Sequence, residues 1–424
     1  MVARIDLWDT VIGAVAWDDQ QGFARVEFTD AYYRSDWNIA PLTMPKEKRM
    51  IHRFPTLPKE TFMGLPGALS DALPDRFGSQ VLDAWLASKG SSIAELTPVE
   101  RLLYQGKRGM GALEFQPANM EYKPPLANIE IDSLVKVANS ILHERNALVL
   151  PLNDINEQDM SQLIQVGTSA GGARAKAVIA INRKTKEIRS GQLNLPKDFE
   201  HYIIKFDGVD QQNLGDPKGF GRIEYAYYLM AMDCGIDMMP SELWEENGRA
   251  HFITQRFDRL NGEKLHMQTL CAMAHYDYNN ATAYSYEQAF QVMRSLRLPF
   301  SDAEKLYRRM VFNAMAQNCD DHTKNISFLM DKMGEWRLSP AYDMTFAYNP
   351  NGQWTHHHQM SVNSKREGID RNDLLSVAKS MNIKRGKSIM DEVTASVSNW
   401  MHFAEQAAIS SEQAEYIKGL HQKL

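Results

Sequence analysis

The alternation of apolar and polar positions predicts strands early in the chain and helices late in it. VIGAVAW and FARVEF alternate with period two and are joined by Asp18–Gly22, which predicts a hairpin within residues 4–33. LWEENGRAHFITQRFDR predicts a second hairpin, because Asn247 and Gly248 suit a tight turn between two strands. After residue 257 the apolar residues recur mainly at helical spacing. The pattern therefore predicts a fold of the α+β class.

Local signals place some helix starts and one boundary between units. Capping boxes predict that helices open at Thr97, Ser285 and Ser301, and the last of these helices leads to Asn318. Residues 116–130 carry two adjacent prolines, few large apolar residues and no periodicity, which is typical of a linker. A length of 424 residues favours two or three structural units. We therefore expect a domain boundary within this linker.

Composition narrows the class of protein. The 47 Lys and Arg against 53 Asp and Glu give a net charge of −6, so no overall positive charge attracts nucleic acid or an anionic membrane. Cys234, Cys271 and Cys319 have neither metal-site nor disulfide spacing. No apolar run approaches the ~20 residues that span a bilayer, and the first residues lack a signal peptide's apolar segment. We expect a cytoplasmic protein without a membrane partner.

Candidate catalytic residues lie in the stretch NCDDHTKNISFLMDKMGEWRLSPAYD. Asp320 and Asn325 are five residues apart, and Asp343 follows eighteen residues later, just beyond a predicted hairpin. Phosphoryl transfer from a nucleotide needs one carboxylate as base, and an amide oxygen and second carboxylate to hold Mg²⁺. Protein kinases space base and amide in this way, and Lys324 could face the transferring phosphate. The alternative is a solvated turn between a helix and a hairpin, because this spacing also arises by chance.

Three further stretches suit a nucleotide. The small-residue segment QVGTSAGGARAKAVIAI leads into a strand, and glycine lets backbone N–H groups approach phosphates; an ordinary glycine turn is the alternative. Lys205 ends the strand HYIIKF, and Glu224 lies in the next helix, the pair that kinases join; a surface lysine is the alternative. Gln255 and Phe257 end the second predicted hairpin, where a kinase hinge meets adenine, although Phe257 could equally belong to the core.

Two other patterns are weaker. Gly106, Gly109 and Gly111 favour a tight turn between a helix and a strand over a phosphate loop, because no lysine–serine signature follows. His356, His357 and His358 are adjacent, so their side chains point in different directions. We therefore do not expect these histidines to share one metal ion.

Taken together, these residues resemble the HipA-like serine/threonine kinases, the toxins of bacterial toxin–antitoxin pairs. The resemblance covers nearly the whole chain. It implies an α+β, two-lobed protein-kinase-like fold, with an N-terminal β-rich subdomain at 1–117, a kinase N-lobe with phosphate loop and hinge at 131–257, and an all-helical C-lobe at 258–424. The motifs that carry it are GLPGALSDALPDRFG, LTPVERLLYQGKRGMGALEF, GTSAGGARAK, HYIIKF, QRFDR, DDHTKN and LSPAYD.

The resemblance also implies roles for individual residues. Asp320 would be the catalytic base, with His322 and Lys324 beside it, and Asn325 and Asp343 would bind Mg²⁺. Ser169, or the adjacent Thr168, would be the site of a silencing autophosphorylation. The residues that would contact ATP are Ser169, Ala170, Gly171, Gly172, Ala173, Lys176, Lys205, Gln255 and Phe257.

The implied function is an ATP- and Mg²⁺-dependent kinase that arrests growth by phosphorylating a translation component, such as an aminoacyl-tRNA synthetase. A helix-turn-helix antitoxin is expected as a separate chain, with DNA contacted only through it. Two alternatives stay open: a small-molecule or lipid kinase with the same nucleotide site, and a catalytically silent partner in a DNA-bound complex. Position 321 is Asp where the best-known family members have Gly, and we expect Asp321 to face solvent or to make a local hydrogen bond.

Overall fold

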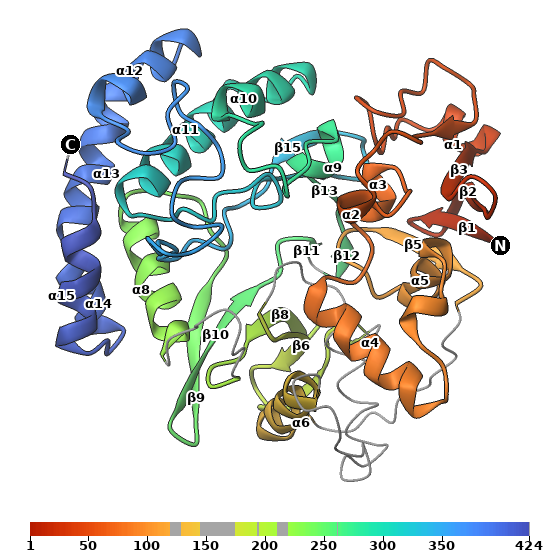
Figure 1. Ribbon diagram of the computed structural model, residues 1–424, viewed down its shortest axis with the longest axis horizontal. Helices are drawn as coiled ribbons and strands as arrows, with labels where there is room; N and C mark the ends of the chain where they lie inside the picture. Colours follow the sequence, from red (N-terminus) through yellow and green to blue (C-terminus); the bar gives the residue numbers. More distant parts are fainter. Residues whose placement is uncertain (119–128, 145–173, 193–194, 210–218, 261, 424) are drawn as a thin grey trace.

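The N-terminal sheet forms the right-hand part of the molecule in Figure 1. The computed structural model describes residues 1–118, 129–144, 174–192, 195–209, 219–260 and 262–423. Five antiparallel strands have the order β4-β3-β2-β1-β5, and the predicted hairpin is β2–β3, with Trp17 opposite Ala24. The elements of this part are β1 (Val2–Leu7), β2 (Thr10–Asp18), β3 (Phe23–Phe28), α1 (Asp30–Arg34), β4 (His52–Arg53), α2 (Lys59–Phe62), α3 (Gly67–Ser70), α4 (Arg76–Ser88), a 3₁₀ turn (Ile93–Glu95), α5 (Pro98–Gln105) and β5 (Leu113–Gln116).

A second five-stranded sheet, with the order β7-β6-β8-β10-β9, lies in the lower centre of Figure 1. Its β9–β10 hairpin turns at Asn247 and Gly248, both with positive φ, as the sequence predicted. Helix α4 of the N-terminal part packs with α6 on this sheet, through residues such as Phe77 and Leu134. The elements are α6 (Ile131–Glu144), β6 (Lys176–Asn182), β7 (Ile188–Ser190), β8 (Phe199–Lys205), α8 (Phe220–Asp233), β9 (Ser241–Glu246) and β10 (Arg249–Gln255).

The C-terminal part contains most of the remaining helices, but it is not all-helical as we expected. Strands β13, β14 and β15 form a three-stranded sheet. All four residues of β14 are buried, so its backbone groups need partners inside the protein, and β13 supplies them. The elements are β11 (Arg259–Leu260), β12 (Glu263–Lys264), β13 (His266–Thr269), α9 (Leu270–Ala274), α10 (Tyr286–Ser295), α11 (Phe300–Met315), β14 (Ser327–Met330), β15 (Trp336–Leu338), α12 (Arg371–Ser380), α13 (Gly386–Ser398), α14 (Trp400–Gln406) and α15 (Ser411–Leu420).

The helix-start predictions have mixed outcomes. The capping boxes at Thr97 and Ser285 are both formed. The box predicted at Ser301 is wrong, because α11 begins at Phe300 with Pro299 as its N-cap, so Ser301 already lies inside the helix. Asp302 instead accepts the backbone N–H of Leu338, at 2.9 Å. The Asp302 carboxylate, which the predicted box did not use, therefore joins α11 to β15.

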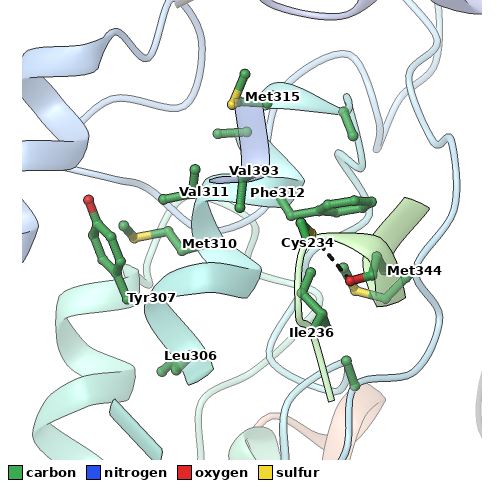
Figure 2. Close-up of a cluster of buried hydrophobic side chains, with 14 of the residues drawn as sticks. Cys234, Ile236, Leu306, Tyr307, Met310, Val311, Phe312, Met315, Met344 and Val393 are labelled. Carbon is green, nitrogen blue, oxygen red and sulfur yellow. Dashed lines mark hydrogen bonds between the residues drawn. The ribbon is translucent and has the colours of Figure 1, made fainter. Parts of the chain in front are cut away.

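Helix α11 is the centre of the C-terminal core and brings the chain to the candidate catalytic stretch. Its apolar side chains, including Met310 and Phe312, lie in the same buried cluster as Met344 and Ile236 (Figure 2). Met344 is 4% exposed and directly follows Asp343. The burial of Met344 therefore fixes the backbone next to the Asp343 carboxylate.

Long-range contacts join the N-terminal part to the C-terminal sheet. Three indole N–H groups donate to backbone carbonyls across this junction: Trp8 to Lys264, Trp37 to Lys332, and Trp336 to Asn38. Gly67 packs so closely on Ala272 that an added Cβ would lie 2.3 Å from a backbone oxygen. The N-terminal part is therefore tightly packed beside the candidate catalytic stretch. Among the helices of the described residues, none is both long enough and apolar enough to cross a membrane.

Candidate active site

The amino group of Lys205, at the end of β8, joins three elements. Its Nζ lies 2.5 Å from Oε1 of Glu224 on α8 and also hydrogen-bonds Oδ1 of Asp343, which follows β15. The sequence only permitted the contact between Lys205 and Glu224, whereas the structure makes it. A strand, a helix and a loop thus present one cation and two carboxylates to each other.

The contacts among these three groups shift their pKa values. Burial raises the pKa of Asp343, but the ammonium groups of Lys205 and Lys176 together outweigh burial and hold the pKa at about 2. Burial also raises the pKa of Glu224, which the Lys205 ammonium lowers only in part. Burial lowers the pKa of Lys205, yet the two carboxylates together raise it above its ordinary value. Asp343 is therefore an anion at neutral pH, while Lys205 is a cation.

The catalytic stretch forms a compact loop in which Asp320 and Asn325 approach each other. Asn325 donates from Nδ2 to the Asp320 backbone oxygen, at 2.7 Å, and its N–H donates to the His322 carbonyl, at 2.8 Å. The nearest His322 nitrogen lies 3.9 Å from the Asp320 carboxylate. Protein atoms around the Asp320 carboxyl raise its pKa, and nearby Asp343 raises it further. Because the Asp320 side chain is still 48% exposed, this carboxylate is accessible.

Lys324, which is in the same loop, lies over an aromatic side chain from an earlier segment. Its Nζ is 4.4 Å from the centre of the Tyr278 ring, and the Tyr278 and His322 rings lie 5.5 Å apart. A cation over an aromatic face gains electrostatic stabilisation. Burial raises the pKa values of Asp71 and Asp75, and the Lys324 ammonium lowers both in part, so it acts on carboxylates of the N-terminal part.

Asp321 does not occupy the position that we expected. It is 3% exposed, so it does not face solvent. Its Oδ2 accepts from the Tyr286 hydroxyl, at 2.9 Å, and lies 3.1 Å from Nδ1 of His358, while Oδ1 accepts from the Gln359 N–H, at 2.8 Å. These partners are distant in sequence, so the bonds are not local either. Neighbouring side chains in the loop point apart, and the one beside Asp320 points into the core.

The phosphate-loop predictions fall mostly outside the described residues. Ser169, Ala170, Gly171, Gly172 and Ala173 all lie there, and so does Thr168. Arg174 is described, and its charge lowers the pKa of both Asp320 and Glu224, which places its guanidinium in the same electrostatic environment.

Lys176 was expected among the ATP contacts, but its ammonium pairs with Asp75, at 3.3 Å, and its side chain is 4% exposed. Asp75 also caps α4 by accepting the Gly78 N–H. Lys176 therefore connects the N-terminal part to the start of β6 and is largely shielded from solvent.

The two hinge candidates lie at the end of β10: Gln255 is its last residue, and Phe257 follows two residues later. The Gln255 N–H donates to the Pro240 carbonyl, at 2.9 Å. The Phe257 ring packs against Tyr342, with 5.5 Å between ring centres, and Phe257 is only half-buried. Phe257 thus contacts the residue before Asp343. The nearby Gly109–Gly111 turn holds another buried charge, because the Gly111 N–H donates to Asp258, in accord with the turn interpretation of these glycines.

Cation-binding groups are few in the part of the chain that the structure describes. No group of three or more His, Cys, Asp or Glu residues there could hold a metal ion. His356, His357 and His358 have different partners, namely the Gly352 carbonyl, Glu367 and Asp321. Asn325 and Asp343 supply oxygen, and the Asn325 amide nitrogen is used by Asp320, so its amide oxygen is the atom left for a cation. Two protein oxygens suit Mg²⁺ when phosphates supply further ligands.

Comparison with known proteins identifies the family. Residues 168–401 match the model of the HipA-like C-terminal domain, and residues 3–116 match the model of the HipA N-terminal domain. The chain belongs to the HipA-like family.

A solved structure and a curated relative extend this result. The HipA toxin of Shewanella oneidensis MR-1, solved with HipB and its operator DNA, is similar with a TM-score of 0.67 and 15% sequence identity, over 98% of this chain and 94% of that one. This similarity shows a mixed α/β fold of the HipA type. A Sinorhizobium fredii protein described as "Putative kinase Y4mE" is 28% identical over 131 residues, which is 28% of this chain and 31% of that protein. The match thus spans about a third of the relative's length.

The sequence did not indicate two ion pairs of this HipA-like chain. Asp75 pairs with Lys176, and Asp321 with His358, and in each case the partner lies far along the chain. No local spacing connects such pairs. Arg174 could have been found, because it is the first cation after the small-residue segment.

Proposed function

We propose that this chain is an ATP- and Mg²⁺-dependent serine/threonine protein kinase and the toxin of a toxin–antitoxin pair. The supporting observation is the contact of Lys205 with both Glu224 and Asp343. In protein kinases a strand lysine must pair with a helix glutamate, and a carboxylate must hold the metal, before phosphoryl transfer proceeds. Family membership and the similarity to a kinase-named relative agree with this proposal. The boundaries at 1–117, 131–257 and 258–424 remain part of the same proposal.

In the proposed reaction Asp320 takes the proton of the acceptor hydroxyl. The hydroxyl oxygen forms a bond to the γ-phosphorus of ATP, the bond from that phosphorus to the bridging oxygen breaks, and ADP leaves. Lys205 binds the nucleotide phosphates, and Lys324 contributes positive charge near the transferred group. Gln255 and Phe257 flank the adenine. The raised pKa of Asp320 favours proton uptake by this carboxylate.

Asn325 and Asp343 would hold Mg²⁺ through their side-chain oxygens. The low pKa of Asp343 keeps this carboxylate charged and suitable for a hard cation. When bound, the ion neutralises charge on the phosphates. Lys205 contacts the same carboxylate. When a nucleotide binds with Mg²⁺, the Asp343 oxygens would therefore have to be shared between the Lys205 ammonium and the metal.

The decisive experiment is phosphoproteomics after brief induction of the wild-type protein and of Asp320→Ala. Phosphosites on serine or threonine that appear only with the wild type would support the proposal and name the substrate. A parallel incubation of purified protein with radiolabelled ATP and cell lysate separates the alternatives. Label in small molecules or lipids would favour a small-molecule or lipid kinase, and no label in any fraction would favour a catalytically silent partner.

The antitoxin proposal has its own support and test. The similar Shewanella HipA was solved with HipB and operator DNA. By this similarity we propose a helix-turn-helix antitoxin as a separate chain, through which DNA is contacted. Growth arrest after expression of this chain alone, relieved by co-expression of a small helix-turn-helix protein encoded beside it, would support the proposal. Equal growth of cells expressing the wild type and Asp320→Ala would contradict toxicity.

Regulation by autophosphorylation is proposed at Ser169, which lies outside the described residues. A phosphate there adds roughly −1.5 to −2 charge, close in sequence to the cations that would meet ATP. We expect Ser169→Asp to weaken ATP binding, measured by calorimetry, with Ser169→Ala as the uncharged control. Unchanged affinity in Ser169→Asp, together with no phosphate on Ser169 or Thr168 by mass spectrometry, would contradict this regulation.

A further inference from the structure

A buried charge pair lies behind the catalytic loop. Asp321 and His358 are 2% and 3% exposed at their side chains, and Oδ2 of Asp321 lies 3.1 Å from Nδ1 of His358. Both groups are surrounded by protein, so neither can exchange its partner for water at low cost. The reaction proposed above uses neither residue.

The pair joins two segments that each carry part of the proposed site. Asp321 lies between Asp320 and His322 in the catalytic loop. His358 lies in the segment that follows Asp343, and that segment is itself fixed. The His358 N–H donates to the Arg366 carbonyl, at 3.0 Å, and the Arg366 guanidinium donates to the carbonyls of His358 and Tyr284. The loop is thus fastened to a segment with its own anchors.

We propose that His358 is a positioning residue, whose charge pair with Asp321 holds the Asp320 carboxylate and the Asn325 amide in their catalytic placement. This inference rests on the proposed kinase function. The remaining attachments of the loop include the Tyr286 and Gln359 bonds to the Asp321 carboxylate, and the Thr323 hydroxyl bond to the Tyr276 carbonyl. Without the imidazolium, Asp321 would be a buried anion whose hydrogen-bond donors are all neutral. The nearby Arg366 guanidinium, whose pKa burial lowers and Asp321 raises in part, donates to backbone carbonyls instead. The loop would therefore shift to bring Asp321 toward water.

The other groups around His358 do not replace Asp321. Nε2 of His358 lies 3.8 Å from Sγ of Cys319, a long contact to a weakly polar sulfur. Arg366 contacts the backbone of His358, so its charge is directed at carbonyl oxygens rather than at the ring. The carboxylate is therefore the main group that favours a protonated His358, with a smaller contribution from Cys319.

The experiment uses four variants of the full chain: His358→Gln, Asp321→Asn, the double variant, and His357→Gln as the matched control. His357 is the adjacent histidine, 41% exposed at its side chain, and its partner Glu367 is 77% exposed. Phosphoryl transfer from Mg²⁺-ATP to casein, or to water where casein is not accepted, gives kcat and the KM for ATP. Thermal melting shows that each variant is folded.

We expect His358→Gln and Asp321→Asn to lower kcat by about tenfold or more, since an error of about 1 Å in placement is costly, while KM for ATP changes less than about threefold. The double variant should recover most of kcat, because an amide pair leaves no buried charge unpaired. His357→Gln should match the wild type. A folded His358→Gln with unchanged kcat, or a double variant no better than the single ones, would overturn the positioning role.

A second measurement does not depend on catalysis. Nitrogen-15 NMR of the imidazole should show His358 protonated at pH 8 in the wild type; a neutral ring would overturn the charge pair. If the wild type transferred no phosphate to any acceptor, the proposed function would fail separately, and loop placement would be read from Mg²⁺-dependent ATP binding. In that case Mg²⁺ should increase the affinity for ATP about fivefold less in His358→Gln than in the wild type. An equal Mg²⁺-dependent increase in both proteins would refute the inference.

Discussion

Asp320 and Asp321 are adjacent in sequence but belong to opposite faces of one loop. Asp320 is 48% exposed at its side chain and lies near other polar groups of the proposed site, including the His322 ring and the Asp343 carboxylate. Asp321 is 2% exposed at its side chain and is held by Tyr286, His358 and Gln359. The open face presents groups that a substrate could meet, while the buried face has its partners already in place.

Two neighbouring aspartates of one loop thus have different roles. A carboxylate with free lone pairs can accept a proton or bind a cation. A carboxylate whose lone pairs are filled inside the protein contributes order instead, because losing one partner leaves a buried charge. Substitutions on the open face should therefore change activity without changing stability, and substitutions on the buried face should change both.

The largest effect on activity is expected at Asp343, whose charge acts on the Asp320 carboxylate of the open face. Asp343→Ala should abolish phosphoryl transfer, because the proposed Mg²⁺ site loses its carboxylate, whereas the protein should stay folded with Lys205 still paired to Glu224. The measurement is γ-phosphate transfer with saturating ATP and Mg²⁺. Asp19→Ala, which removes an exposed carboxylate from the β2–β3 turn, is the control. Full activity of Asp343→Ala would remove this residue from the site.

A second large effect is expected at Asp320. Asp320→Asn should lower turnover by at least ~100-fold, the lower end of general-base effects, and should leave the melting temperature nearly unchanged because the side chain is half-exposed. Growth inhibition should disappear with the activity. If Asp320→Asn remained active and Asp321→Asn were inactive but stable, the assignment of the base would be wrong by one residue.

At Asp321 the expected change is mainly in stability. Asp321→Asn should reduce the free energy of unfolding by about 3 kcal/mol, the lower end for breaking a buried pair by removing one partner, and should lower turnover about tenfold through loop order. Denaturant titration of Asp321→Asn and Asp320→Asn measures the contrast directly. If the two variants had equal free energies of unfolding, the proposed difference between the buried and the open face of the loop would be wrong.

The smallest effect is a dependence on pH. Burial lowers the pKa of His358, but the Asp321 carboxylate outweighs burial and raises it to about 10. Because this value exceeds the ordinary ~6.5, the stabilisation by the pair is complete below about pH 6.5 and disappears as pH rises toward 10. The difference in melting temperature between the wild type and the Asp321→Asn, His358→Gln double variant should shrink over this range. A constant difference would contradict a protonated His358.

The sequence by itself predicted much of the local structure. Short-range features were predicted correctly: the three hairpins β2–β3, β9–β10 and β14–β15, the capping boxes at Thr97 and Ser285, and the loop that brings Asp320 and Asn325 together. Turn and capping chemistry acts between residues a few positions apart. The motifs also indicated the family, which the comparison with family models confirmed. They singled out Lys205 and Asp343 as well, and the structure brings these two residues into contact. The roles of these residues stay predictions.

The tertiary structure decided which charged side chains are buried and with whom. Asp321 and His358 are 37 residues apart, and Asp75 meets Lys176 only because α4 packs on the second sheet. In the C-terminal part the sequence predicted the β14–β15 hairpin, but the pairing of β14 with β13, from residues about 60 positions earlier, came only with the tertiary structure. The physical reason is that desolvation depends on everything packed around a group. Spacing along the chain fixes which groups are neighbours in a loop, but only the assembled fold fixes which of them lose water.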